Sequence, residues 1–355
     1  MKNIYRSLIS IFLIVLLTIP INSIYAGNKD RSGQAGAGEL LINPWARSSG
    51  WGGVNTANVR GVESMFINIA GAAFTKGTEL VFTQTQWLKG SEINISNFGF
   101  TQQLGETGVL GISVMSMDFG DIELTTVNLP DGGIGYFSPK YLNIGLSYSK
   151  AFSNSIYGGF NLKIISESMS DVSAQGVAID VGIQYVTGPE DNIKFGVTLR
   201  NWGPTMKFTG DGLSIRGFLP GQESQFTLNQ RSDDFELPSQ LNIGFAYDFN
   251  FKGDSRLTLA GNFNSNSFTK DQFSLGAEFS LKSYLILRGG YTYEEGIYKD
   301  IEDIDRTNCT KGPSAGFSVQ VPLNKEKGTC FSVDYSYRAT DHFNGTHTIG
   351  ARINL

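Results

Sequence analysis

The sequence has few of the residues on which most catalytic and metal sites depend. Its 355 residues include only two histidines, His342 and His347, and two cysteines, Cys309 and Cys330. Imidazole is the most frequent general base and a common metal ligand, and no Ser–His–Asp grouping can be assembled from this sequence. We therefore expect a non-enzymatic protein with no cofactor and no metal centre.

Charged residues are also scarce, at 17% of the chain, and the formal net charge is −5. Nucleic-acid binding depends on neutralising phosphates with Lys and Arg, so this balance argues against a nucleic-acid partner. Glycine and aromatic residues are plentiful, with 43 glycines and 12% Phe, Trp and Tyr. Aromatic residues favour strands and glycines favour tight turns. The composition predicts β-structure with many turns.

Long apolar runs are missing except near the N-terminus, where "LISIFLIVLLTIPI" follows Lys2 and Arg6. With "SIYA" ending at Ala26, this stretch predicts a cleaved secretory signal over residues 1–26. A membrane anchor is the alternative, and the absence of a cysteine after the run argues against a lipoprotein. No later segment approaches the roughly 18 to 20 apolar residues that a transmembrane helix needs.

Apolar residues alternate with polar ones through much of the chain after residue 79. In "LNIGFAYDFNF", for example, Leu241, Ile243, Phe245 and Phe249 fall on every second position. A period of two is the mark of a strand whose two faces differ. We expect about fourteen strands. Their predicted limits are 79–88, 92–103, 108–118, 140–152, 155–168, 174–187, 192–202, 237–251, 255–267, 270–281, 284–296, 314–323, 329–340 and 346–355.

The polar face of these strands carries many ionised or amide groups. They are Asn161, Lys163, Asp180, Gln184, Lys194, Arg200, Asp248, Glu278, Arg288, Asp334, Arg338 and Arg352. About eight strands already make a barrel that side chains can fill, so fourteen would enclose more space than an apolar core could occupy. The pattern predicts an all-β fold, a transmembrane antiparallel β-barrel over residues 79–355, with apolar residues towards lipid and polar ones towards the lumen. A pair of packed sheets is the alternative.

The chain ends in "THTIGARINL", where Ile349, Ala351, Ile353 and Leu355 alternate with polar residues or glycine. A barrel in lipid must satisfy every backbone group, so its last strand has to pair with its first. We predict that residues 346–355 close the ring. The ending also resembles the C-terminal signal by which outer-membrane assembly machinery recognises barrels, although that signal usually ends in an aromatic residue.

The three longest connections, 119–139, 203–236 and 297–313, all follow odd-numbered strands, which predicts that they lie at one end of the barrel. With a periplasmic N-terminus, this end faces outward. Loop 203–236 is rich in apolar residues that suggest a docking surface for a partner; folding inward to plug the pore is an equal alternative. The candidate docking residues are Met206, Phe208, Leu213, Ile215, Phe218, Leu219 and Phe226.

Two further features lie near the end of the eleventh strand. Its acidic loop contains Glu294, Glu295, Asp300, Glu302, Asp303 and Asp305. Such oxygen ligands suit Ca²⁺, but their spacing matches no EF-hand, so we expect a solvated loop. Export favours a disulfide between Cys309 and Cys330. The predicted topology places them at opposite ends of the barrel, so we expect free thiols unless the strand register in this region is wrong.

Residues 27–78 lack this alternation and are rich in Gly and Ala, so we expect short helices and loops at or within the periplasmic mouth. Part of this segment, "ARSSGWGGVNTANVRGVESMFINIAG", resembles the N-terminal signature of the PorV/PorQ family of Bacteroidetes outer-membrane proteins, which is related to FadL-type transporters. That signature reads Ala-Arg-x-x-Gly-x-Gly-Gly, then an aromatic residue and Asn-Pro-Ala-Gly. The matching residues are Ala46, Arg47, Gly50, Gly52, Gly53, Phe66, Asn68, Ala70 and Gly71. Ile69 replaces the proline.

The resemblance implies a FadL-like barrel in the outer membrane, surrounded by lipid. It also implies a role in the type IX secretion system, docking the translocon and the C-terminal signal domains of cargo for export or surface attachment. A FadL-like channel for uptake of a hydrophobic small molecule is the alternative. A phosphate-binding loop is a poor interpretation of the glycines, because no Lys-Ser/Thr follows them. Close backbone packing explains them better.

Overall fold

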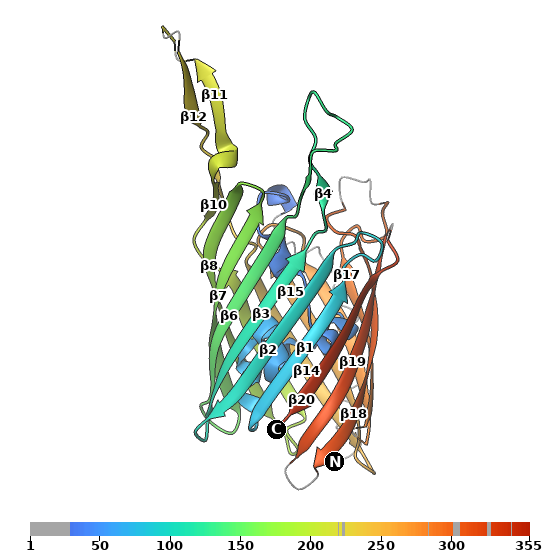
Figure 1. Cartoon of the computed structure of the whole chain (residues 1–355). Helices are drawn as coiled ribbons and strands as arrows, with labels where there is room; N and C mark the ends of the chain where they lie inside the picture. The colour runs from blue at the N-terminus through green and yellow to red at the C-terminus, as the bar shows by residue number, and fades with distance from the viewer. Residues whose placement is uncertain are drawn as a thin grey trace.

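The structure is a computed structural model that describes residues 29–218, 220–221, 224–282, 284–300, 306–324, 328–341 and 343–355. The predicted signal segment, residues 1–26, lies outside these ranges. Fourteen long strands form one closed antiparallel barrel (Figure 1). They are β1 (Thr78–Gln86), β2 (Asn94–Leu104), β3 (Gly108–Asp118), β6 (Lys140–Ala151), β7 (Ile156–Met169), β8 (Val172–Thr187), β9 (Ile193–Trp202), β14 (Gln240–Phe251), β15 (Ser255–Asn266), β16 (Gln272–Leu281), β17 (Leu285–Glu294), β18 (Thr310–Asn324), β19 (Thr329–Thr340) and β20 (Thr346–Asn354).

The ring closes between the last strand and the first. β20 pairs antiparallel with β1, with Ala351 opposite Phe82, and the backbone of Leu355 exchanges hydrogen bonds with that of Thr78 at 2.8 and 3.1 Å. Every other barrel strand pairs with its neighbour in sequence, including β8 with β9. The predictions of a fourteen-stranded antiparallel barrel and of a closing C-terminal strand are confirmed. The alternative of two packed sheets is excluded because the sheet has no open side.

The apolar residues of the strands point away from the lumen. Leu241, Ile243, Phe245 and Phe249 of β14 are between 40% and 47% exposed, whereas Asn242 of the same strand is 4% exposed. Alternate residues of a strand lie on opposite faces, so the polar residues face inward. The outer wall is therefore an apolar surface of the kind that contacts hydrocarbon.

Residues 29–77, which we call the plug, form short helices; the start of this segment lies at one rim of the barrel and the remainder lies inside it (Figure 1). None of the helices in the described ranges is long and apolar enough to span a membrane. The plug packs against β6, β7 and β8 on one side of the wall and against β18 and β19 on another. Its elements are η1 (Lys29–Arg31), η2 (Gly38–Leu41), α2 (Ala46–Gly50), η3 (Asn55–Ala57), η4 (Gly61–Glu63), α3 (Ser64–Ile67) and η5 (Ile69–Phe74).

The two ends of the barrel differ in the length of their connections. Tight turns such as 105–107 and 252–254 lie at the short-turn end, where the chain also terminates, and the long loops lie together at the opposite, long-loop end (Figure 1). The grouping of the long loops at one end is thus as predicted. The long loops contain β4 (Ile122–Glu123), β5 (Tyr136–Phe137), β10 (Met206–Thr209), η6 (Asp211–Leu213), β11 (Ser214–Phe218), β12 (Gln225–Asn229) and β13 (Asp234–Phe235).

Candidate functional site

Arg47 ties the plug to the barrel wall. It lies in the first turn of α2, and its guanidinium reaches β19, where Nε donates to Asp334 Oδ1 at 2.9 Å and Nη2 donates to Ser332 Oγ at 2.7 Å. Asp334 is 1% exposed. A buried carboxylate needs a counter-charge, and here the plug supplies it to the wall. This ion pair therefore holds the plug against β19.

A second cationic centre, Arg352 of β20, joins three parts of the chain. Its guanidinium forms ion pairs with Glu63 of the plug and Glu79 of β1, and it lies 3.6 Å from Asp334. Glu63 also accepts hydrogen bonds from the backbone N–H and the hydroxyl of Ser48, at 2.8 and 2.6 Å. The plug is therefore fixed at the seam where the last strand meets the first.

The signature glycines allow backbone to approach backbone. A Cβ on Gly50 would lie 3.1 Å from Cα of Gly316 in β18, and one on Gly71 would lie 2.2 Å from the carbonyl oxygen of Val59. Gly52 and Gly53 have φ of +75° and +71°, the left-handed region that favours glycine. These contacts support the packing interpretation of the glycines.

Asn68 caps the N-terminus of η5 and also forms a hydrogen bond with the wall. Its side-chain oxygen accepts from the N–H of Ala70 at 3.2 Å, and its Nδ2 donates to the carbonyl of Ile183 in β8 at 3.1 Å. Phe66 lies beneath the guanidinium of Arg200, 4.1 Å from ring centre to Cζ. Ala46 and Ala70 are buried. The signature residues thus lie either in the internal packing of the plug or at its contact with the wall.

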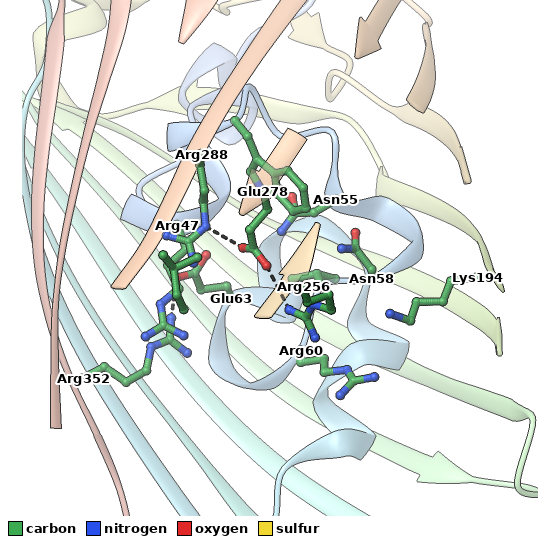
Figure 2. A pocket seen from close by; sticks show the side chains of 13 residues that line it. Arg47, Asn55, Asn58, Arg60, Glu63, Lys194, Arg256, Glu278, Arg288 and Arg352 are labelled. Carbon is green, nitrogen blue, oxygen red and sulfur yellow. Dashed lines mark hydrogen bonds and ion pairs between the residues drawn. The ribbon is translucent and has the colours of Figure 1, made fainter. Parts of the chain in front are cut away.

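A cavity of about 190 Å³ lies between the plug and the wall, and most of its ionisable lining is cationic (Figure 2). Its cations come from the plug and from β9, β15, β17 and β20, and they are Arg47, Arg60, Lys194, Arg256, Arg288 and Arg352. Glu278 of β16 lies between two of them, accepting from Arg288 Nε at 2.7 Å and from Arg256 Nη2 at 3.0 Å. We call this the basic cavity.

A larger cavity of about 320 Å³ lies nearer the long-loop end, and its lining is mixed. Phe66 and Ile67 of the plug face polar wall residues that include Gln240 and Glu294. Glu294 accepts hydrogen bonds from Gln272 and Asn308 at 2.8 and 2.6 Å, so this member of the acidic loop is engaged with protein groups.

The lumen at the long-loop end also contains an apolar cluster that sequence analysis missed. Its buried members are Ala37, Leu40, Ile95, Met115, Met117, Tyr141, Ile165, Ala174, Ala178, Met206 and Leu237. The sequence held a signal for it, because β2 and β3 have apolar residues on both faces and alternate less cleanly than later strands. The prediction that polar residues face the lumen therefore does not hold at this end.

The candidate docking loop divides into two parts. Met206 and Phe208 of β10 pack onto the apolar cluster, and Met206 is only 1% exposed. Their predicted place on an exposed surface is wrong, because β10 pairs with β8 and turns these side chains inward. Ile215, Phe218 and Phe226 are at least 37% exposed on the β11–β12 hairpin, which projects well beyond the barrel rim (Figure 1). Leu213 is half-buried, and Leu219 lies outside the described residues.

At the end of the chain, Ile349 and Leu355 are more than half exposed on the outer wall, and Ala351 and Ile353 are partly exposed beside them. In the acidic loop, Glu302, Asp303 and Asp305 lie outside the described residues. The rest of the chain, so far as it is described, brings no three His, Cys, Asp or Glu side chains together in a way that could hold a metal ion.

Both cysteines are free and lie at opposite ends of the wall, Cys309 before the start of β18 and Cys330 opposite Pro322 at its far end. Burial raises the pKa of the Cys309 thiol. Because the thiolate is the nucleophile, we expect Cys309 in a Cys330→Ser variant to react with iodoacetamide more slowly at neutral pH than glutathione does, and to react faster as the pH rises. Mass spectrometry without reduction should find both thiols unlinked in the wild type. Rapid labelling at neutral pH, or a linked peptide pair, would contradict this.

A known protein family and several solved structures are similar to this chain. The family described as type IX secretion system membrane protein PorP/SprF matches residues 65–353. None of the curated protein sequences matches the chain. Among solved structures, the Pseudomonas putida toluene transporter TodX is similar, with a TM-score of 0.53 and 14% identity over 88% of this chain and 97% of that one.

Two further structures are similar. The Ralstonia pickettii toluene transporter TbuX has a TM-score of 0.52 and 13% identity over 88% of this chain and 97% of its own. A FadL homologue from Pseudomonas aeruginosa has a TM-score of 0.48 and 10% identity, with coverages of 87% and 96%. The barrel shares its fold with the two toluene transporters, and identities this low show the fold alone.

Proposed function

We infer the function of this protein from its family: the chain belongs to the PorP/SprF family of type IX secretion system membrane proteins. It is an outer-membrane β-barrel of that system, and membership suggests protein partners within it. We propose that it is non-enzymatic and docks the translocon and the C-terminal signal domains of cargo. The narrower resemblance to PorV/PorQ proteins stays a prediction, as does the cleaved signal peptide.

The observation that carries the docking proposal is the β11–β12 hairpin. Its two strands form a separate two-stranded sheet, which projects beyond the rim of the barrel (Figure 1). Ile215, Phe218 and Phe226 are 45%, 61% and 37% exposed on it. Clustered apolar side chains at an exposed site mark surfaces that partners cover. A lumen occupied by the plug also fits docking better than free passage through the barrel.

The hairpin is tested by replacing Ile215, Phe218 and Phe226 together with serine. We expect co-purification of translocon subunits and cargo to fall at least tenfold, because truncating a few apolar anchors removes most of the binding energy of an interface. The barrel should still assemble, since these exposed side chains lie on a hairpin that projects beyond the barrel rim (Figure 1). The measurement is quantitative mass spectrometry of detergent pull-downs, together with secretion of the cargo.

Val127→Ser is the matched control, because Val127 is an exposed apolar residue in a different long loop. Unchanged co-purification and secretion in the triple variant would count against docking through the hairpin. Removing residues 214–229 is a stronger form of the same test. A deletion that begins at Met206 is unsuitable, because it would also remove part of the apolar cluster in the lumen.

A second candidate function is a channel for a hydrophobic small molecule, favoured by the apolar cluster at the long-loop end and by the fold shared with toluene transporters. Saturable quenching of tryptophan fluorescence by toluene, lost when Met115 is replaced by glutamine, would favour it. Toluene that only partitions into the membrane without saturation would leave docking as the better account.

A further inference from the structure

The basic cavity has more cationic than anionic groups. Six cations line it, and the carboxylates paired with them in the described structure are five, namely Glu63, Glu79, Asp248, Glu278 and Asp334. The unpaired cation is Arg60 of the plug. Within the described ranges its side chain makes no hydrogen bond or ion pair, and its guanidinium carbon lies 4.6 Å from the centre of the Phe74 ring.

Arg60, Arg256 and Lys194 form one group within the cavity, on the side away from Arg47 and Arg352 (Figure 2). They come from three separate elements, the plug, β15 and β9. The Arg256 side chain is 39% exposed and shares Glu278 with Arg288, while its Nε atom has no hydrogen-bond acceptor. Arg60 and Arg256 thus keep donor groups that protein acceptors do not use.

These like charges are close enough to oppose one another. Arg60 is open to the lumen, yet the surrounding wall displaces much of the bulk water. This desolvation lowers the pKa of the Arg60 guanidinium, and the like charge of Arg256 lowers it further, while the carboxylates of Asp248 and Asp191 offset part of this shift. Arginine nevertheless stays protonated in proteins. An anion between the two guanidinium groups would relieve this repulsion.

We propose that the basic cavity binds a phosphate group, either free or on a small ester, between Arg60, Arg256 and Lys194. A phosphate monoester carries a charge of about −1.5 to −2 and three strong acceptor oxygens, which suits donors that converge from three directions. Guanidinium groups bind such oxygens in a bidentate manner. The cavity of about 190 Å³ far exceeds the roughly 10–15 Å³ that one water needs, so a small substituent also fits.

The geometry also predicts the route and the consequence of binding. Lys194 lies one residue from the start of β9, and Arg256 lies one residue from the start of β15. Both strands begin at the short-turn end, so the anion enters from that side. Because Arg60 belongs to the plug and the other two belong to the wall, bound phosphate bridges them. A ligand that binds only the folded state raises the unfolding temperature.

The test uses the full-length barrel in detergent at constant ionic strength. Isothermal titration with inorganic phosphate should show saturable binding at millimolar concentration, with a rise in the unfolding temperature that chloride does not produce. Arg60→Gln should weaken binding at least tenfold. Arg216→Gln, which removes an exposed arginine from the distant hairpin, should bind as the wild type does. Arg60→Lys keeps the charge but loses the bidentate pair of donors, so its affinity should lie between those of the wild type and Arg60→Gln.

Two further probes identify the source of the phosphate group. Tighter binding of glycerol 3-phosphate than of inorganic phosphate indicates a small ester, and tighter binding of short-chain phosphatidic acid indicates a lipid headgroup. The proposal is overturned if the wild type binds none of the three, or if Arg60→Gln binds phosphate as well as the wild type while its heat-modifiable gel migration shows a folded barrel. None of these outcomes depends on the hairpin, so the docking proposal stands or fails separately.

Discussion

Replacing Arg352 with alanine is expected to lower the free energy of unfolding by about 3–5 kcal/mol. The guanidinium is buried, and it is the only ion-pair partner of Glu63 and Glu79 within the described structure. Its loss leaves two buried carboxylates uncompensated, which costs more than the pairs themselves contribute. The measurement is urea unfolding in lipid vesicles, followed by heat-modifiable gel migration.

Two further variants separate this effect from a general loss of charge. Arg216→Ala removes an exposed arginine from the hairpin and should change stability by no more than about 0.5 kcal/mol. Adding Glu63→Gln to Arg352→Ala removes one of the stranded charges and should recover part of the loss. An Arg352→Ala barrel as stable as the wild type would show that solvent in the lumen, rather than Arg352, compensates these carboxylates.

Replacing Phe245 with arginine is also expected to lower the stability of the barrel by a large amount. Phe245 lies midway along β14 and points outward. An arginine that faces lipid at the bilayer midplane costs a β-barrel about 2–4 kcal/mol, but only about 0–1 kcal/mol near an interface. Phe251→Arg is the matched control, because Phe251 is exposed on the same face at the last position of the same strand.

The free energies of unfolding of these two variants are compared by denaturant unfolding in lipid vesicles. Equal effects at the two positions, or no effect at Phe245, would mean that the outer face of β14 does not contact hydrocarbon. Such a result would contradict the membrane orientation of the wall, and with it the placement of this barrel in the outer membrane. Detergent alone is a poor medium for this test, because micelles have no fixed midplane.

The strands could be predicted closely from the sequence. The predicted strand 255–267 is observed as Ser255–Asn266, and 329–340 as Thr329–Thr340. This agreement has a physical cause: lipid on one side and a polar lumen on the other impose a period of two along each strand. The closing role of the last strand was predictable for a related reason, since an unpaired edge cannot exist in hydrocarbon.

The contacts of the plug were not predictable in the same way. Arg352 meets carboxylates at positions 63, 79 and 334, and no local pattern relates these positions. The residues around Arg60 do not alternate between apolar and polar, so the sequence does not indicate which way its side chain faces. Met206 and Ile215 are both apolar residues of one loop. The pairing of β10 with β8 buries Met206, whereas Ile215 lies on the hairpin and is exposed.

The sequence by itself thus determined most of the wall of this protein: how many strands it has, where they begin and end to within four residues, and which way most of their residues face. Those properties depend on each residue's contact with one of two solvents, and the chain encodes that contact locally. Tertiary structure alone decided how the plug is held, which cations share the basic cavity and which part of the long loop projects. Those properties depend on groups that are distant in the chain and meet only after the ring has closed.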